Sequence, residues 1–412
     1  MIGILKRRLY SLAFIDEFGP VYAVYTLWFN DNGVTTSQVS TVFLVWALVA
    51  LLLEIPSGAL ADRVDRRRLL AMAFGIRAVG IALWLVWPTL TGVFIGAVLW
   101  ATHDALASGS WEAMIHDELT AVAAADRYGP VMARIGQFSN LGVAAGTAVG
   151  AGLLRLDVGL VALGWITVAA HAGSIALVTS LPDVRWVTGT ASDGDRSARS
   201  PVGAWWATLR TGLAAAGRES AVGRLLVIGA LLEGLFLLDE YIPLLSRARG
   251  APDAAAPVIV LVVWIGLLLG GEVAARRPAL PGSLLGLALV AATGLTALSL
   301  IGDAVWALAL IAVGHAALET VWITSDARLQ ERATRATRAT VTSVRGFGSA
   351  CVSMAMFAVI AMLSDGDDPT PGLFVLVATL AAAGLLIVRW LPPQAAVPAT
   401  IAADRRPPPR IA

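Results

Sequence analysis

The sequence has little charge, a single cysteine and one lysine. Only 14% of its 412 residues are charged, whereas a soluble domain has about a quarter. A mean hydropathy of +0.75 and 57% hydrophobic residues therefore exclude an ordinary soluble domain and indicate a surface that mostly faces lipid. The single cysteine, Cys351, excludes an intramolecular disulfide and a cysteine-based metal cluster.

The few charges nearly cancel, which argues against a nucleic-acid partner. Thirty basic and 29 acidic residues leave a net charge of +1, so no basic excess exists to neutralise phosphates. Every basic residue except Lys6 is arginine, which with the high alanine and glycine content indicates a bacterium with a GC-rich genome. No metalloprotease, serine-hydrolase, P-loop or dinucleotide motif occurs in a plausible context. We therefore expect no enzyme, no cofactor and no metal ion.

Long apolar segments account for most of the chain. A helix that crosses a bilayer needs about 20 largely apolar residues, and twelve segments meet this requirement. They lie near residues 9–30, 38–60, 69–87, 91–115, 131–154, 158–181, 222–246, 256–275, 281–301, 304–327, 341–363 and 372–391. The predicted fold is all-α and integral to the membrane, with twelve transmembrane helices in two pseudo-symmetric six-helix lobes.

One long polar segment divides these helices into two sets of six. We predict an N-terminal lobe over residues 1–181 and a C-terminal lobe over residues 221–391. Residues 182–220 between them should form a cytoplasmic linker with a short helix on the membrane surface. Residues 392–412, rich in proline and arginine, should be a disordered cytoplasmic tail.

The arginines are distributed unevenly between alternate loops. If both termini lie in the cytoplasm, nearly all arginines outside the spans fall on the cytoplasmic side, and only Arg155, Arg247 and Arg249 fall outside. Arg77 lies within the third span. The positive-inside rule therefore predicts a multi-pass protein of the bacterial cytoplasmic (inner) membrane with both termini cytoplasmic.

The loop between the second and third spans contains a recognisable motif. Gly58 is followed four residues later by Asp62, then by Arg63 and a basic cluster that includes Arg66. This pattern resembles the signature loop of the major facilitator superfamily, at the position where that family has it. Asp65 stands where the family usually has glycine. The span count, the long central segment and the loop charges extend the resemblance to the whole chain.

The resemblance implies a conformational latch at the cytoplasmic side. In the family, the motif acid and the following basic residue form pairs that break and re-form as the lobes rock. Asp62 and Arg66 would take these roles beside Gly58 and Arg63, with Asp117 as a candidate partner at the inner end of span four. The other interpretation is an arginine cluster that only fixes topology, which would not need the glycine and the aspartate at this spacing.

We expect this chain to resemble the drug exporters of the family, but it lacks two of their sequence features. Span four has His103 and Asp104 in place of the arginine that many drug antiporters have there. Span five lacks their Gly-Pro pair and has four glycines instead, which predict a face for close helix packing. These glycines are Gly142, Gly146, Gly150 and Gly152.

Several ionisable side chains lie at membrane depth, where a charge is costly unless it faces a cavity or a partner. We predict that they line the substrate cavity and handle protons. For the histidines, a packed interhelical role is the alternative. The set comprises Asp16, Glu17, His103, Asp104, Glu233, Asp239, Glu240, His315 and Glu319.

Two of these acids occupy matching depths in the two halves. Asp16 precedes Gly33 by seventeen residues, and Glu233 precedes Gly250 by seventeen. We therefore predict that this pair, related by the pseudo-twofold axis, carries proton coupling, with Asp239 and Glu240 nearer the outer mouth. His315 and Glu319 share a face of span ten, but two ligands alone do not indicate a metal site.

Together these features predict a secondary transporter that works by alternating access. Its partners would be a small-molecule substrate, protons and membrane lipid, and it would be a monomer. An acid-lined apolar cavity without a central cation favours proton-coupled efflux of a lipophilic or cationic compound. The alternative is a proton-coupled uptake symporter of a metabolite. A non-transporting membrane sensor and an integral-membrane enzyme are the alternatives of another class.

Overall fold

The computed structural model describes residues 2–61, 64–181, 210, 220–333, 338–364 and 367–394. Within them, ten helical segments are long and apolar enough to cross a membrane. Two further expected spans are helical as well. The first is broken into two helices, and the fifth is one continuous helix. The predicted all-α fold with twelve transmembrane segments is confirmed.

The first half of the chain forms six of these segments. Its helices are α1 (Ile2–Glu17), α2 (Tyr25–Asp31), α3 (Thr36–Ala61), α4 (Arg66–Val86), α5 (Leu90–Ala121), the short η1 (Ala125–Arg127), α6 (Tyr128–Arg155) and α7 (Leu160–Thr179). Together α1 and α2 make the first span. We call these helices the N-bundle.

The second half repeats this plan. Its helices are α10 (Ser220–Glu233), η2 (Leu238–Tyr241), α11 (Ile242–Ala248), α12 (Ala255–Arg276), α13 (Gly282–Ile301), η3 (Val305–Leu310), α14 (Ile311–Arg332), α15 (Arg338–Leu363) and α16 (Thr370–Trp390). Here α10, η2 and α11 together make one span. We call these helices the C-bundle.

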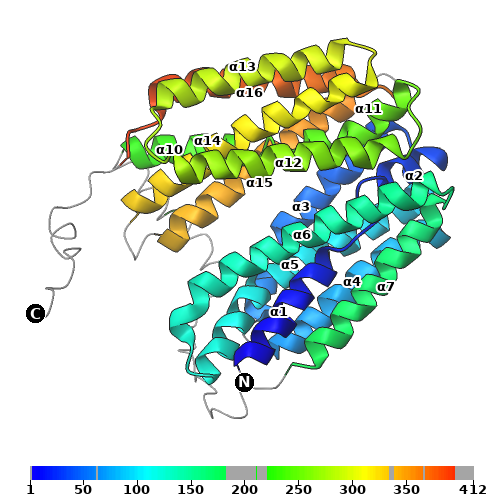
Figure 1. Cartoon of the computed structure of the whole chain (residues 1–412), viewed down its shortest axis with the longest axis vertical. Helices are drawn as coiled ribbons and strands as arrows, with labels where there is room; N and C mark the ends of the chain where they lie inside the picture. The colour runs from blue at the N-terminus through cyan, green and yellow to red at the C-terminus, as the bar shows by residue number, and fades with distance from the viewer. Residues whose placement is uncertain are drawn as a thin grey trace, which may run out of the picture.

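The two bundles lie side by side and approach each other at one end (Figure 1). Between them α3 packs on α15 and α6 packs on α12. The short helices α2 and α11 lie at the end where the bundles meet, and the bundles diverge toward the end where the N-terminus lies (Figure 1). We call these the α2–α11 end and the N-terminal end.

Hydrogen bonds join the bundles at the α2–α11 end. The Tyr241 hydroxyl donates to the Ser40 hydroxyl over 2.8 Å, and Ser37 donates to the carbonyl of Ala361 over 2.6 Å. Arg247 donates to Asp31 over 2.5 Å. No hydrogen bond between two described residues joins the bundles at the N-terminal end.

Matching turns follow the two short helices. Gly33 after α2 and Gly250 after α11 have φ angles of +81° and +74°, a region that side chains with a Cβ rarely occupy. These turns show that α2 and α11 end at equivalent points of the two halves.

Glycines on α6 allow the first span to approach closely. A Cβ at Gly142, Gly146 or Gly150 would collide with the backbone of Phe14, Gly19 or Pro20 respectively, whereas Gly152 has open space around it. The expected packing face is thus confirmed for three of the four glycines, and Gly152 is not part of it. Small residues favour this kind of contact because helices in lipid associate largely through close packing.

Some sequence-based predictions lie outside the described residues. These are the linker with its surface helix at 182–209 and 211–219, the tail from residue 395, and the latch residues Asp62 and Arg63.

Candidate functional site

The first span and the first span of the C-bundle are both interrupted near mid-depth. Helix α1 ends at Glu17 and α2 begins at Tyr25, with Pro20, which has no backbone N–H, between them. Helix α10 ends at Glu233, and the short η2 begins at Leu238. Non-helical backbone is tolerated at membrane depth only where it is buried in protein or lines a cavity.

A cavity of about 230 Å³ lies between the bundles at these interruptions. Its walls are mixed, with aromatic and small apolar side chains around several charged groups. The N-bundle contributes Glu17, Tyr22, Ala23, Tyr25, Thr26, Arg77, Trp100, Val143 and Thr147, and the C-bundle contributes Asp239, Glu240, Pro243, Val260 and Trp264. A ligand held here would therefore contact both bundles.

Two carboxylates of the C-bundle form one wall of the cavity. The Tyr25 hydroxyl donates to Oε2 of Glu240 over 2.5 Å, a bond that crosses from one bundle to the other. Among the described residues, neither Asp239 nor Glu240 forms an ion pair with a basic side chain. Glu17 lines the same cavity, so three of the predicted site acids share it.

Arg77 of α4 supplies a cation to this cavity. Its side chain is 5% exposed, and its guanidinium lies over the rings of Trp100 and Tyr22, 4.5 and 4.9 Å from their centres. Among the described residues it makes no hydrogen bond and no ion pair within 4.0 Å, and its Nε is buried without a partner. The expectation of a cavity without a central cation was therefore wrong, because helix packing turns this residue of span three toward the cavity.

Asp16 is held inside the N-bundle by a buried histidine. Its Oδ1 lies 3.6 Å from Nδ1 of His171, which belongs to α7 and is fully buried. Nε2 of His171 shares a hydrogen bond of 2.8 Å with the hydroxyl of the cavity residue Tyr22. A chain of polar groups thus connects Asp16 to the cavity wall.

His103 and Asp104 of α5 form a second polar group in the N-bundle. Nδ1 of His103 donates to Oδ1 of Asp104 over 3.0 Å, and Nε1 of Trp46 donates to its Oδ2 over 3.1 Å. His103 is buried and packs on Phe74. These partners fix Asp104 within the bundle.

Glu233 lies at the predicted depth but not in the cavity that the sequence predicted for it. It ends α10 as Asp16 and Glu17 end α1, so the equal depth agrees with the helix register. Its carboxylate, however, lies 3.0 Å from Nε of Arg345, which also pairs with Asp326. The structure therefore places Glu233 in an ion-pair cluster of the C-bundle, and it is Asp239 and Glu240 that share the cavity with Glu17.

His315 and Glu319 lie one turn apart on α14. His315 is buried, with Nδ1 3.2 Å from the carbonyl of Ile311 and its ring against Phe236. Glu319 is partly buried and has no hydrogen bond or ion pair with any described residue. No group of three or more His, Cys, Asp or Glu side chains in the described part of the chain could hold a metal ion.

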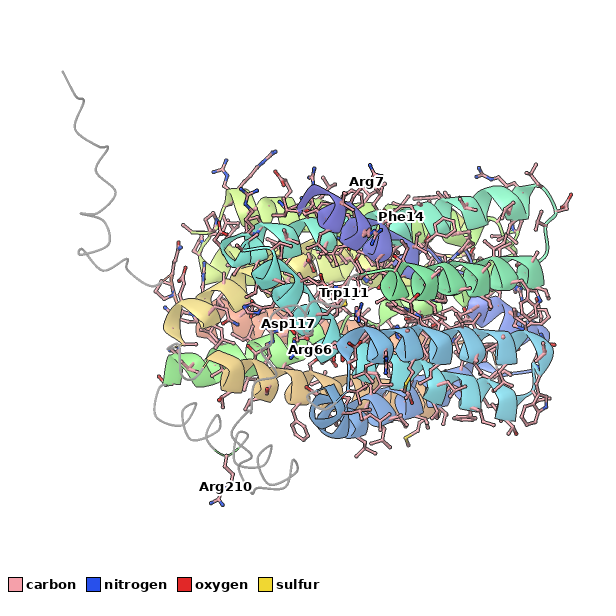
Figure 2. All side chains as sticks on the ribbon, turned by 90° about the horizontal axis from the view of Figure 1, so that it is seen from below. Arg7, Phe14, Arg66, Trp111, Asp117 and Arg210 are labelled. Atoms are coloured by element: carbon pink, nitrogen blue, oxygen red, sulfur yellow. The ribbon has the colours of Figure 1, made fainter. Side chains whose placement is uncertain are left out.

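Two of the predicted latch residues, Arg66 and Asp117, lie together in the N-bundle (Figure 2). Arg66 donates to Asp117 over 2.5 Å and to the carbonyl of Ala113 over 2.9 Å. Asp65 caps α4 by accepting from the backbone N–H groups of Arg67 and Arg68. Burial raises the pKa of Asp65, but these hydrogen bonds and the Arg67 charge outweigh it and leave the pKa below its ordinary value. Gly58 lies in α3.

Sequence reasoning missed several residues of the site. Arg77 and His171 are ionisable groups in the middle of apolar spans, and the rule applied to the intramembrane acids would have identified them. Tyr25 and Trp100 gave no such signal, because aromatic residues are common in any membrane span. Their part in the cavity depends on the packing of the two bundles.

Comparisons with known proteins agree with this architecture. The model of a family described as the Major Facilitator Superfamily matches residues 9–358. No curated protein matches the chain by sequence.

Several solved transporters share the fold at low sequence identity. The nucleoside transporter NupG matches with a TM-score of 0.69 at 14% identity, over 98% of this chain and 100% of that one. A D-xylose-proton symporter matches with a TM-score of 0.67 at 13% identity, over 95% and 97%. A bacterial homolog of the human lysosomal transporter Spinster, inward-facing and occupied, matches with a TM-score of 0.61 at 16% identity, over 94% and 93%. At these identities the likeness concerns the fold alone.

Proposed function

The chain belongs to the major facilitator superfamily, and we propose that it is a proton-coupled secondary transporter that moves a small polar molecule by alternating access. The observation that carries this proposal is the cavity between the bundles, which is lined by carboxylates from both of them. A site shared by two bundles that join at only one end can be exposed to either side of the membrane when the bundles rock.

The hydrogen bonds at the α2–α11 end support an inward-facing state. With the orientation that the positive-inside rule gives, the α2–α11 end faces the outside of a bacterial cytoplasmic membrane and both termini lie in the cytoplasm. The divergent end then opens to the cytoplasm (Figure 1). Rocking would break the bonds of Arg247 and Tyr241 and bring the cytoplasmic ends together.

Proton coupling is best assigned to the cavity acids. A carboxylate that meets water from each side in turn can take up a proton on one side and release it on the other. Glu17, Asp239 and Glu240 line the cavity, whereas Glu233 is neutralised by Arg345. We therefore move the role predicted for Asp16 and Glu233 to Glu17 and Asp239, with Glu240 held by Tyr25.

Arg77 also changes the proposed substrate. The prediction of efflux of a lipophilic or cationic compound depends on a cavity without a central cation, and a buried guanidinium would repel a cation. Arg77 therefore favours the alternative, a polar metabolite. A sensor or an enzyme has no support of this kind, since the family and the solved relatives are transporters.

Transport by purified protein in lipid vesicles tests the proposal. A panel of labelled small polar metabolites is offered under an imposed pH gradient of either sign. Accumulation on the alkaline side indicates symport, and accumulation on the acidic side indicates antiport. Glu17→Gln and Asp239→Asn should abolish accumulation but retain downhill exchange, because the site can still move while no proton is carried.

Glu272→Gln is the matched control, since Glu272 forms an exposed ion pair with Arg276 one turn away on α12. It should accumulate substrate like the unchanged protein. Gradient-driven accumulation in both Glu17→Gln and Asp239→Asn would contradict the assignment of proton coupling. Absence of any gradient-driven flux in the unchanged protein would contradict transport of the compounds offered.

A further inference from the structure

Burial of the Arg77 guanidinium without a hydrogen-bond partner is energetically unfavourable. A guanidinium has five N–H donors and remains charged at any physiological pH, and a buried charge without a hydrogen-bonded partner destabilises a fold. The guanidinium lies over the rings of Trp100 and Tyr22, but cation–π contact leaves the N–H groups on its edge unsatisfied. A residue of this kind needs either a structural partner or a ligand.

The acids near Arg77 do not act as that structural partner. Asp16, Glu17 and Asp104 are close enough to interact with its charge, yet none comes within 4.0 Å. Asp16 lies beside His171, and Asp104 accepts from His103 and Trp46. The edge of the guanidinium is therefore available to a planar oxyanion, which it can bind through two parallel hydrogen bonds.

The opposite wall has the complementary charge. Asp239 and Glu240 come from the C-bundle and form no ion pair with any described basic residue, although Glu240 accepts from Tyr25. They line the same cavity as Arg77. A ligand with a positive group could satisfy them while its negative group binds Arg77.

An aromatic recess adjoins this charged cavity. A smaller cavity of about 90 Å³ shares Tyr25, Trp100 and Glu240 with it and is otherwise lined mainly by rings and aliphatic groups, including Phe43 and Trp84. Such a recess holds an apolar or aromatic body and excludes water from it.

We propose that Arg77 is the anion-binding residue of the transport site and that the substrate is a zwitterion with an apolar body. Its carboxylate binds the Arg77 edge, its ammonium group faces Asp239 and Glu240, and its body enters the aromatic recess. This inference rests on the proposed transport function and names its substrate class. A zwitterion that bridges the bundles also stabilises the state in which they approach each other, which a singly charged ligand would do less well.

Binding to the purified full-length protein tests the charge pattern without knowledge of the natural substrate. Three probes share one phenyl-ethyl body and differ only in charge: L-phenylalanine, 3-phenylpropionate and 2-phenylethylamine. Titration calorimetry should give the zwitterion an affinity at least about tenfold higher than that of either singly charged probe, since a bidentate charged contact contributes more than 1.4 kcal/mol.

Variants of each charged wall separate the two contacts. Arg77→Gln should bind L-phenylalanine no better than 2-phenylethylamine, and Arg77→Lys should restore part of the difference because it keeps the charge but not the fork. Asp239→Asn should weaken the two amine-bearing probes and leave 3-phenylpropionate unchanged or tighter. Arg68→Gln changes an exposed arginine at the start of α4 and should leave all three affinities unchanged.

Three results would overturn the proposal. They are equal affinity of the amine and the zwitterion for the unchanged protein, unchanged affinity of both carboxylate probes for a folded Arg77→Gln protein, and no binding of any probe at millimolar concentration. Failure of transport is distinguishable from these outcomes. If the zwitterion binds through Arg77 but no pH gradient drives it across vesicles, the transport proposal fails and the assignment of Arg77 stands.

Discussion

Ionisable side chains at membrane depth in this protein differ in whether they have a partner. Glu233 and Asp326 both pair with Arg345, so their charges are compensated within one bundle. Arg77 and Asp239 have no ion-pair partner among the described residues, although both line the cavity. Because an unpaired charge away from water is destabilising, a bound ligand or proton would stabilise the protein most at Arg77 and Asp239.

At the same scale, the ion pair of Arg66 with Asp117 is expected to affect movement more than ligand binding. Both residues lie outside the cavity lining, so the affinity for the ligand should stay unchanged in Arg66→Gln. Turnover should slow by a factor of about two to five, as expected for loss of a partly exposed pair worth about 0.5–1 kcal/mol. Asp62→Asn should also slow turnover without changing affinity, because the family resemblance of its loop implies the same latch role for Asp62.

Binding and transport are to be measured on the same preparation of each variant. Arg68→Gln is the control, since it removes a neighbouring charge that is exposed. Normal turnover by a well-expressed Arg66→Gln protein would rule out the latch role.

At the scale of elements, the interrupted first span depends on the glycine face of α6. The backbone leaves the helical path after Glu17, and only glycine at positions 142, 146 and 150 allows α6 to lie against residues 14–20. The same contact positions Glu17 and Tyr22 at the cavity. Close packing of α6 is thus a condition for the geometry of the site.

Gly146→Ala should destabilise the protein by about 1–3 kcal/mol, the usual effect of an added methyl group in a tightly packed contact. Its Cβ would lie 2.7 Å from the backbone nitrogen of Gly19, and a backbone cannot move away as a side chain can. Thermal unfolding in detergent measures the effect.

Gly152→Ala is the matched control on the same helix, because open space surrounds that position. It should be neutral or stabilising by up to about 1 kcal/mol, since alanine is the better helix former. Equal unfolding temperatures for the two variants would contradict the close packing of α6 on the first span.

At the scale of the whole molecule, the α2–α11 end joins the bundles, and under the proposed alternating access it is the closed gate. Arg247 contributes most directly, because it contacts Asp31 of the N-bundle while it also pairs with Asp253 of its own bundle. Arg247→Gln removes the charged contact between the bundles. The population open at this end should rise roughly two- to fivefold, in line with about 0.5–1 kcal/mol for a pair of this exposure.

The measurement is the rate at which a membrane-impermeant thiol reagent modifies Ala23→Cys, a cavity position, from outside. Cys351, which is exposed, is replaced by serine. Arg249→Gln is the control, because Arg249 donates only to carbonyls of its own bundle, those of Ala304 and Ser299. The same labelling rate for both arginine variants would exclude a gating role for Arg247.

Topology gives a further prediction for the whole molecule. Tags inserted within residues 182–200 or after Pro398 should be accessible only from the cytoplasm, because arginines gather on that side of the predicted spans. Accessibility of each tag in intact and permeabilised cells measures this. Labelling of either tag from outside would overturn the proposed orientation.

The sequence determined the fold, because the requirements of a membrane span apply to each segment separately. Each span must satisfy its own backbone hydrogen bonds and present an apolar surface to lipid, so twelve segments could be identified residue by residue. The acids at positions 16, 17, 239 and 240 were recognisable for the same reason, since a charge at membrane depth is conspicuous within its own segment.

Only the tertiary structure decided which of these charges share a cavity. Depth along a helix predicts the level of a side chain, but its partner depends on how neighbouring helices are rotated. Glu233 therefore matches Asp16 in depth and still pairs with Arg345, and Arg77 of span three reaches the cavity. Contacts such as that between Tyr25 and Glu240, 215 residues apart, arise from packing of whole bundles, which no local pattern in the sequence encodes.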